Sequence, residues 1–286
     1  MTWAKSPKQP PRRRWIVGAC SLLGVAGLQP SVAAGQIPAL PEGASTMWVV
    51  SDPEEIVSWR AFDPSRVSDR LPAGVRFLSL GELASAGISW AEDYLEAHPT
   101  QREWGVSFLE ILHAGEFALD GRTPNWPDGG AVGLWFARIA PTGDTDLGLG
   151  IPLLELEFWV PDAAYVTYMR ELGHYASYGD VRLTGTPSGE RRGSVSIEGL
   201  SLRVSCSPEG PTSGGSTSAG VQVLLPPGTP SVNGVVRIAF AGHREQKCAG
   251  DPAWLIEGRH PLATTVAIAP SVLQFGYRLV GGLYRR

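Results

Sequence analysis

Turn-forming residues divide this chain into short segments, and that spacing limits its fold more than any other feature. Clusters of Gly, Pro and Asp separate runs of β-branched and aromatic residues, and the chain contains 35 glycines and 24 prolines. Short strands joined by frequent turns are typical of antiparallel sheets and barrels, whereas parallel strands need long crossovers. The sequence therefore predicts an α+β, mainly β protein, with an antiparallel barrel-like sheet and a few flanking helices. The predicted strands are Met47–Val50, Arg76–Leu80, Gly105–Ala114, Gly130–Ile139, Leu153–Val160, Val181–Thr186, Gly193–Ile197, Leu200–Cys206, Val221–Leu225, Val235–Ala241 and Thr264–Ala269.

One of these segments, Leu153–Val160, alternates as expected for a strand with one face in the core. Successive side chains of a strand point to opposite faces of the sheet. The alternation predicts one face made of Leu154, Leu156, Phe158 and Val160, and an opposite face made of Glu155, Glu157 and Trp159. Three tryptophans, Trp135, Trp159 and Trp254, are expected either to pack in the core or to line an apolar cavity.

Two short helices are predicted before the first long strand. Asp63 followed by Pro64 is a capping residue with proline at the first helical position, which predicts a helix to about Leu71. A second helix is predicted from Ser89 to His98, because Pro99 disfavours its continuation.

The third predicted helix begins after Asp162. Apolar residues recur at helical spacing and form one stripe, and Gly173 suits the carboxyl-terminal cap. The stripe consists of Tyr165, Tyr168, Met169 and Leu172.

The first 34 residues have the pattern of an export signal. Lys5, Lys8 and three arginines (12–14) form a basic region, residues 16–28 form a short apolar run, and Val32-Ala33-Ala34 fits a cleavage site. The apolar run is short for a membrane-spanning helix. These features predict a signal peptide over residues 1–34, cleavage near Ala34, and export to the periplasm or the cell exterior. Export by the general secretory route or by the twin-arginine route stays open.

Removal of this segment leaves 19 basic residues against 28 acidic ones, a net charge of −9, because it holds five of the 24 bases and none of the acids. Such a charge disfavours binding to nucleic acids and to anionic membranes.

Residues 35–286 are long enough for one domain with its own core, and no linker divides them. Residues Pro208 to Gly220 are predicted to form a low-complexity loop. The expected partner is a small-molecule ligand, with no membrane insertion after cleavage; assembly into a homo-oligomer stays open.

Two cysteines remain after cleavage, Cys206 and Cys248. An even pair in an oxidising compartment predicts one disulfide, with two buried free thiols as the alternative. There is no Cys-x-x-Cys motif that would indicate a redox or metal site.

Glu110 is the strongest candidate for a functional side chain. It lies in the segment Val106 to Leu112, which is apolar on both faces, so its carboxylate is expected to be buried or to line a cavity. An unpaired buried carboxylate is costly or has a raised pKa. Two interpretations stay open: a structural ion pair with Arg138 or Arg170, or an acid in a pocket.

Other catalytic and cofactor motifs are absent from the sequence. It has no Gly-x-Ser-x-Gly elbow, no phosphate-binding loop with lysine, and no Gly-x-Gly-x-x-Gly after a strand. Glu110, His113 and Glu116 would share one side of a helix, but the surrounding pattern is a strand, in which Glu110 and His113 face opposite ways. We therefore predict no metal site and no cofactor.

The segment from Leu156 to Val204 has the order strand, acidic cap, helix with Arg170-Glu171-Leu172, turn with Tyr175, and strand pair. In this order it resembles the acetoacetate decarboxylase-like superfamily. The resemblance implies a β-barrel-like sheet with flanking helices around a closed pocket. In that family a lysine that forms an imine with a keto acid follows the tyrosine, and here its position falls on Ser177, which cannot form an imine. Once the signal is removed, Lys247 is the one lysine left, and its polar surroundings predict a solvated loop.

The resemblance also assigns acids and a basic group. The family's active-site acid lies within a strand similar to Phe108-Leu109-Glu110-Ile111, so Glu110 takes that place. Glu116 and Asp120 are the candidates for a second acid, and Arg60 is nearest to the family's N-terminal arginine. His174 and Tyr175 fall in the turn where the family's pocket lies, and histidine can exchange protons near neutral pH.

Two hypotheses of function follow. The first is an enzyme acting on a small carbonyl or carboxylate compound without a lysine Schiff base, in which Glu110 and His174 serve in acid–base catalysis and Arg170 holds a carboxylate. The second is an exported binding barrel without turnover, whose apolar ligand contacts Trp159, Tyr175 and Ser177. A structural or partner-binding role would instead leave no open pocket.

Overall fold

The computed structural model describes residues 46–143, 151–186, 188–214, 219–225, 234–249 and 254–285. The predicted signal peptide, residues 1–34, lies outside these ranges. Within them, no helix is long and apolar enough to cross a membrane.

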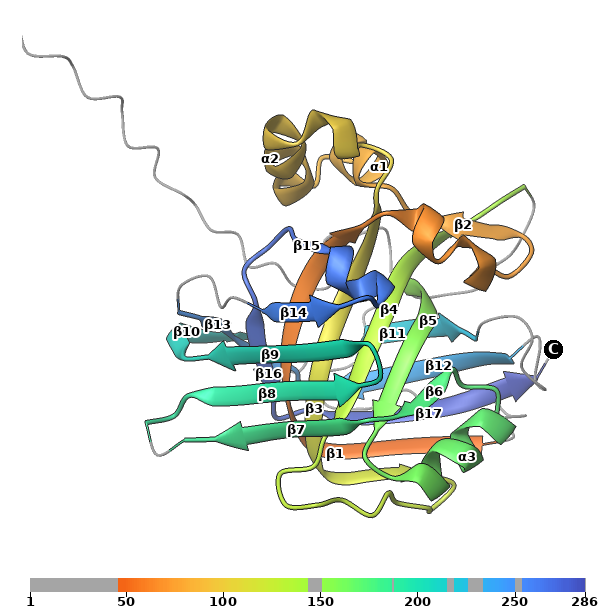
Figure 1. The fold of residues 1–286 in the computed structure, drawn as a ribbon, viewed down its shortest axis with the longest axis vertical. Helices are drawn as coiled ribbons and strands as arrows, with labels where there is room; N and C mark the ends of the chain where they lie inside the picture. The colour runs from red at the N-terminus through yellow and green to blue at the C-terminus, as the bar shows by residue number, and fades with distance from the viewer. Residues whose placement is uncertain are drawn as a thin grey trace, which may run out of the picture.

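Strands make up most of the described chain, as the turn spacing predicted (Figure 1). They are β1 (Thr46–Phe62), β2 (Val75–Phe77), β3 (Gly105–Leu119), β4 (Val132–Pro141), β5 (Ile151–Val160), β6 (Ala176–Tyr178), β7 (Asp180–Gly185), β8 (Arg191–Ile197), β9 (Leu200–Cys206), β10 (Pro208–Gly214), β11 (Ala219–Leu224), β12 (Gly234–Ala241), β13 (Arg244–Cys248), β14 (Leu255–Gly258), β15 (Val266–Ala267), β16 (Val272–Phe275) and β17 (Arg278–Arg285).

The main sheet curves around a central space. Pairings run from β1 through β3, β4, β5, β11, β12 and β17, and β17 pairs back with β1; the contact between β5 and β11 is parallel. The other strands extend beyond this circuit, and the order of the sheet runs from a free edge at β10 to another at β2. The predicted mainly antiparallel, barrel-like architecture is therefore confirmed, but the sheet as a whole is not a closed barrel.

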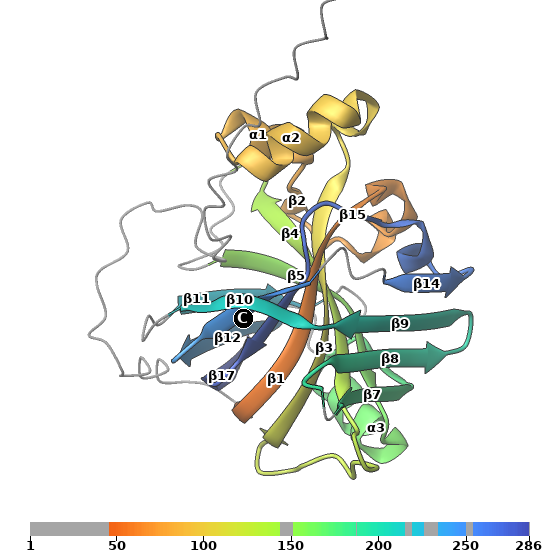
Figure 2. The same ribbon diagram turned by 90° about the vertical axis from the view of Figure 1, so that its left-hand side faces the viewer.

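A second, four-stranded sheet of β7, β8, β9 and β14 stacks on one side of the main sheet (Figure 2). Large apolar side chains fill the space between the two sheets; Trp135 and Trp159 of the main sheet are fully buried there. Gly133 leaves room for the ring of Trp159, its register partner on β5, and for Val195 of the second sheet, because a Cβ at that position would lie 2.6 Å from Cε3 of Trp159 and 3.2 Å from Cγ2 of Val195. The predicted pair Cys206–Cys248 is at disulfide bonding distance, with an S–S separation of 2.05 Å, and it links β9 to β13 of the main sheet.

The predicted helices are present with shorter bounds. Asp63 caps the 3-10 turn η1 (Pro64–Arg66), and a second 3-10 turn, η2 (Ser68–Arg70), follows it, instead of one helix to Leu71. The helices α2 (Ser89–Ala97) and α3 (Ala163–Glu171) confirm the predictions, and Asp162 caps α3 through the backbone nitrogens of Ala164 and Tyr165. The helix α1 (Leu80–Ser85) was not predicted; it begins with a capping box formed by Ser79 and Glu82. Two further 3-10 turns are η3 (Pro99–Gln101) and η4 (Pro261–Thr264).

Several predictions of strand and loop were wrong. The predicted strand Arg76–Leu80 ends at Phe77, and the predicted strand Thr264–Ala269 is a strand only over Val266–Ala267. The first strand continues through Asp52 and Pro53 to Phe62, because Asp52 adopts a φ of 50° and the pairing with β3 keeps its register beyond it. The predicted loop Pro208 to Gly220 forms β10, which pairs with β13, and the beginning of β11; residues 215–218 of that loop are outside the described ranges.

A β-bulge in β5 reverses the predicted faces of that strand. Trp135 pairs with Glu157, but the next residue, Phe136, pairs with Glu155, so Leu156 is an extra residue. A bulge shifts the alternation by one position. Leu154, Leu156 and Trp159 therefore pack between the two sheets, and Leu153, Phe158 and Val160 lie on the inner side of the main sheet. The predicted grouping of Phe158 and Val160 with Leu154 was wrong for this reason.

Candidate functional site

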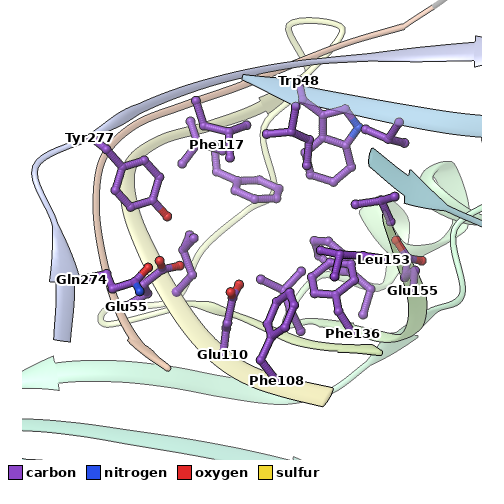
Figure 3. A pocket seen from close by; sticks show the side chains of 18 of the residues that line it. Trp48, Glu55, Phe108, Glu110, Phe117, Phe136, Leu153, Glu155, Gln274 and Tyr277 are labelled. Carbon is purple, nitrogen blue, oxygen red and sulfur yellow. The ribbon is translucent and has the colours of Figure 1, made fainter. Parts of the chain in front are cut away.

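A cavity of about 130 Å³ lies inside the curve of the main sheet (Figure 3). Aromatic and aliphatic side chains form most of its wall. The lining consists of Trp48, Val50, Glu55, Trp59, Phe108, Glu110, Leu112, Phe117, Leu134, Phe136, Arg138, Leu153, Glu155, Phe158, His174, Val223, Val236, Ile238, His243, Gln274, Tyr277 and Leu279. A mostly apolar cavity with a few converging polar groups is typical of a small-molecule site.

Two glutamates share one side of the cavity. Glu110 of β3 pairs in register with Val57 of β1, and Glu55 is two residues from Val57, so the two carboxyl groups are diagonal neighbours on one face. Figure 3 shows both of them pointing into the cavity. Two carboxylates at this spacing repel each other, and the apolar wall gives them little solvation.

Burial therefore raises the pKa of both carboxyl groups. Desolvation raises the pKa of Glu110 well above its usual value, and the charge of Glu55 raises it further. Desolvation also raises the pKa of Glu55 to about 7, against opposing effects of a hydrogen bond from Tyr277 and the charge of His243. The pair exchanges protons as a unit. The raised pKa favours the protonated form of Glu110, and Glu55, with a pKa of about 7, is poised between its two forms at neutral pH.

Tyr277 and Gln274 complete this side of the site. The Tyr277 hydroxyl is hydrogen-bonded to the Glu55 carboxylate, and desolvation and the two nearby glutamates raise the pKa of Tyr277 well above its usual value. The phenol of Tyr277 therefore stays protonated and donates a hydrogen bond to the carboxylate of Glu55. Gln274 is buried beside Glu55, as Figure 3 shows, and it lies on β16 next to β1.

A histidine and a carboxylate form a second polar pair in the wall. Nδ1 of His174 lies 2.8 Å from Oε2 of Glu155, and the backbone nitrogen of Tyr175 donates to Oε1 of Glu155 at 2.7 Å. Only 3% of His174 and 1% of Glu155 is exposed. The Trp48 ring meets the imidazole edge to face at 5.1 Å, and Nε2 of His174 has no hydrogen-bond partner among the described residues. The imidazole is therefore fixed by Nδ1, and Nε2 is left for a ligand.

Arg138 is the one guanidinium among the residues that line the cavity. Its Nε is buried without a hydrogen-bond partner, and no carboxylate of the described chain lies within ion-pair distance of it. Desolvation lowers the pKa of Arg138, but arginine remains charged in proteins. The interpretation of Glu110 as an ion-pair partner of Arg138 or Arg170 is thus not supported in the described structure, and the interpretation as a cavity acid is.

Comparisons with known proteins come from structure alone, since no protein-family model and no curated protein matches the sequence. The enduracididine biosynthesis enzyme MppR complexed with pyruvate superposes with a TM-score of 0.50 at 12% identity, over 84% of this chain and 90% of its own. Acetoacetate decarboxylase from Legionella pneumophila superposes with a TM-score of 0.51 at 10% identity, over 88% of this chain and 93% of its own. The chain has the acetoacetate decarboxylase-like fold. At these identities the similarity shows the fold and not the reaction.

Two of the catalytic residues that the resemblance implied lie in the cavity of this acetoacetate decarboxylase-like fold, and one does not. Glu110 and His174 line it. Arg170 is exposed on α3, where its Nε donates to the backbone oxygen of Ala176 at 2.6 Å, so it braces the end of the helix instead of facing the cavity.

The three predicted ligand contacts also lie outside the described cavity lining. Trp159 packs between the two sheets, because the bulge in β5 turns it away. Ser177 of β6 pairs with Trp159 of β5. Tyr175 is 41% exposed, and the guanidinium of Arg70 lies 4.5 Å from the centre of its ring. The turn that follows α3 therefore contributes His174 to the cavity and not its neighbours.

The remaining family candidates occupy other places in the acetoacetate decarboxylase-like fold. Glu116 and Asp120 are exposed, where they accept hydrogen bonds from Ser51 and Tyr168. Arg60 is buried and donates to Thr265. Lys247 is exposed on β13, and no lysine of the described chain lines the cavity. The described residues contain no group of three potential metal ligands.

Six polar residues of the cavity were not predicted from the sequence to belong to it: Glu55, Arg138, Glu155, His243, Gln274 and Tyr277. A signal existed for Glu55, which stands before Ile56 and Val57 in a strand-like run, but the predicted strand ended at Val50. Glu155 was predicted to lie on the face of β5 opposite Leu154, and no cavity was predicted on that face. Nothing local marks Arg138 or Tyr277, because only the closure of the sheet brings them to the site.

Proposed function

We propose that the protein is an enzyme that moves protons on a small carbonyl compound held in this cavity, without a lysine Schiff base. The observation that supports it most is the pair Glu55–Glu110, in which one apolar site holds two carboxyl groups of raised pKa. Two titratable groups whose environments separate their pKa values are the usual arrangement of an acid and a base.

In this proposal the roles follow from protonation state. Glu110, as the neutral acid, donates a hydrogen bond to the carbonyl oxygen of the bound compound. Glu55, whose pKa lies near neutral pH, accepts a proton from the carbon beside that carbonyl and returns it. A base is most effective when its pKa is near the working pH. Tyr277 positions Glu55 through the hydrogen bond to its carboxylate.

His174 is the second acid–base candidate in the proposal. Glu155 fixes its Nδ1, so the neutral imidazole carries its proton there and presents Nε2 as an acceptor. Because His174 comes from the turn after α3 and Glu110 from β3, two proton-handling groups reach the bound compound from different elements. The lack of a cavity lysine among the described residues supports acid–base chemistry over imine formation.

A binding protein without turnover is the second candidate. It is favoured by the wall itself, in which apolar side chains, aromatic ones such as Phe108, Phe117 and Phe136 together with aliphatic ones, outnumber the polar ones. For either candidate we propose export. The Cys206–Cys248 disulfide supports an oxidising compartment, together with the signal peptide expected over residues 1–34.

The test is solvent deuterium exchange at the carbon beside the carbonyl, followed by proton NMR for a panel of small ketones and oxo acids. The enzyme hypothesis predicts exchange with the wild-type protein and a loss of about 100-fold or more in Glu55→Gln and Glu110→Gln, the usual contribution of one acid or base. Glu96→Gln, an exposed glutamate on α2, is the matched control. No exchange by the folded wild-type protein, or full exchange by Glu110→Gln, would overturn the proposal.

A further inference from the structure

Arg138 has no role in the proton transfer, although it lines the same cavity. Glu110 pairs in register with Leu134, and Arg138 is four residues further along β4. With strand rise and spacing, the two Cα atoms are roughly 14 Å apart. The guanidinium and the acid pair thus belong to opposite ends of the cavity wall.

The rings of two phenylalanines lie along the wall between these ends. Phe108 and Phe136 are register partners on β3 and β4, and their ring centres are 5.3 Å apart. Phe136 lies two residues before Arg138 on the same face of β4, and Figure 3 shows Phe108 and Phe136 next to Glu110. A compound in contact with Glu110 therefore has an apolar surface that leads toward Arg138.

A guanidinium in this position favours an anion. Arg138 is half-buried and its Nε is buried without a hydrogen-bond partner, so its charge has lost part of its contact with water, and a bidentate carboxylate is the usual partner of arginine. The nearest carboxylate along the sheet is Glu155, the partner of Phe136 and a diagonal neighbour of Arg138, but its oxygens are directed to His174 and to the Tyr175 backbone, and it forms no ion pair with Arg138. The counter-ion of Arg138 is thus left for a ligand.

Charge and volume restrict that ligand further. Three carboxyl groups line the cavity, those of Glu55, Glu110 and Glu155, so a dianion such as phosphate meets more repulsion than a monoanion. The volume of about 130 Å³ is close to that of an engineered cavity of about 150 Å³ that binds benzene. The walls are aromatic, so they match a ring or a compact branched chain.

We propose that Arg138 is the anchor for the carboxylate of a compact, ring-sized monocarboxylate, whose other end reaches the Glu55–Glu110 pair. This proposal rests on the proposed function only for the reaction of the bound compound. Binding of the monocarboxylate by Arg138 is a separate property. Arg138 thus takes the carboxylate-binding role that was predicted for Arg170.

The experiment is isothermal titration calorimetry of the full-length protein at neutral pH with benzoate and with benzamide, a neutral compound of the same shape. The proposal predicts that benzoate binds about 10- to 100-fold more tightly than benzamide, the usual effect of one charged hydrogen-bonded contact. Arg138→Gln removes this preference. Arg170→Gln makes the same charge change at an exposed site and leaves the preference intact.

Equal affinity for benzoate and benzamide in the wild-type protein would overturn the proposal, as would a preference that survives in Arg138→Gln or disappears in Arg170→Gln. Circular dichroism checks the fold of each variant. Should Arg138→Gln not fold, Arg138→Lys replaces it, since a lysine keeps the charge without the bidentate geometry; undiminished benzoate affinity in that variant would count against the anchor. Glu110→Gln separates the two claims: it abolishes proton exchange if the proposed function is right, but it leaves the dependence of benzoate binding on Arg138 unchanged.

Discussion

Replacement of Glu55 by glutamine should stabilise the protein at alkaline pH, although the residue is buried. The carboxyl group has a pKa of about 7 in the folded chain and an ordinary value of 4.5. In the unfolded chain it loses its proton near the ordinary value, so between pH 4.5 and 7 the folded state binds more protons. Folding stability therefore falls as the pH rises through this window, and below pH 4.5 this carboxyl has no effect.

The size of the effect follows from the shift in pKa. A difference of 2.5 units corresponds to about 3 kcal/mol of unfolding free energy lost above pH 7. Glutamine cannot ionise, so Glu55→Gln recovers that loss, less about 1 kcal/mol for a weaker hydrogen bond from Tyr277. At pH 5 the variant and the wild type should differ by no more than about 1 kcal/mol, and at pH 8 the variant should be more stable by about 2 kcal/mol.

The assay is urea denaturation followed by tryptophan fluorescence at pH 5, 6, 7 and 8. Glu96→Gln, which removes an exposed carboxylate from α2, is the control, and its difference from the wild type should be small at every pH. A stability difference between Glu55→Gln and wild type that does not change with pH would show that folding does not raise the pKa of Glu55. A wild type that is the more stable protein at pH 8 would show the same.

Three further predictions concern other parts of the structure. Reduction of the Cys206–Cys248 disulfide, which closes a loop with a sequence separation of 42, should lower the unfolding free energy by about 4 kcal/mol, measured by denaturation with and without dithiothreitol; an unchanged midpoint would contradict it. Glu155→Ala should cost about 3 kcal/mol because it removes the partner of both His174 and the Tyr175 backbone, whereas Glu155→Gln should cost less, and equal losses would argue against the hydrogen bonds as the cause. Gly133→Ala should destabilise by about 1–3 kcal/mol in a thermal melt because its Cβ meets Trp159, and Gly115→Ala, a strand position where the nearest atom would be 3.7 Å away, is the control.

Local signals predicted the elements of this fold well where the determinants are themselves local. Asp162 and the apolar stripe predicted α3, and the bounds of β9 match the prediction Leu200–Cys206. The bulge at Leu156 could not be foreseen, because an extra residue in one strand is defined only by its partner strand, here β4. For the same reason β10 was predicted as a loop: its Gly, Pro and Ser residues form a strand only by pairing with β13.

The candidate site was predictable only in part. Glu110 stood out because a carboxylate among apolar neighbours needs an explanation, and His174 followed from the resemblance. Arg170 was preferred to Arg138 because it lies in the segment that resembles the family, but a helix places it on the surface. Glu55 and Tyr277, more than 200 residues apart in sequence, meet only because β16 and β17, on either side of Tyr277, return to pair with β1.

We expect Glu110 to be a neutral carboxylic acid in the cavity at physiological pH. Infrared difference spectroscopy tests it directly, because the carbonyl stretch of a protonated carboxyl group is separate from the bands of carboxylates and amides. At pH 7 the wild-type protein minus Glu110→Gln should show the band of a protonated carboxylic acid, and the band should persist well above the ordinary pKa of 4.5. A difference spectrum with only carboxylate bands at pH 7 would contradict the claim, and with it the proposed acid.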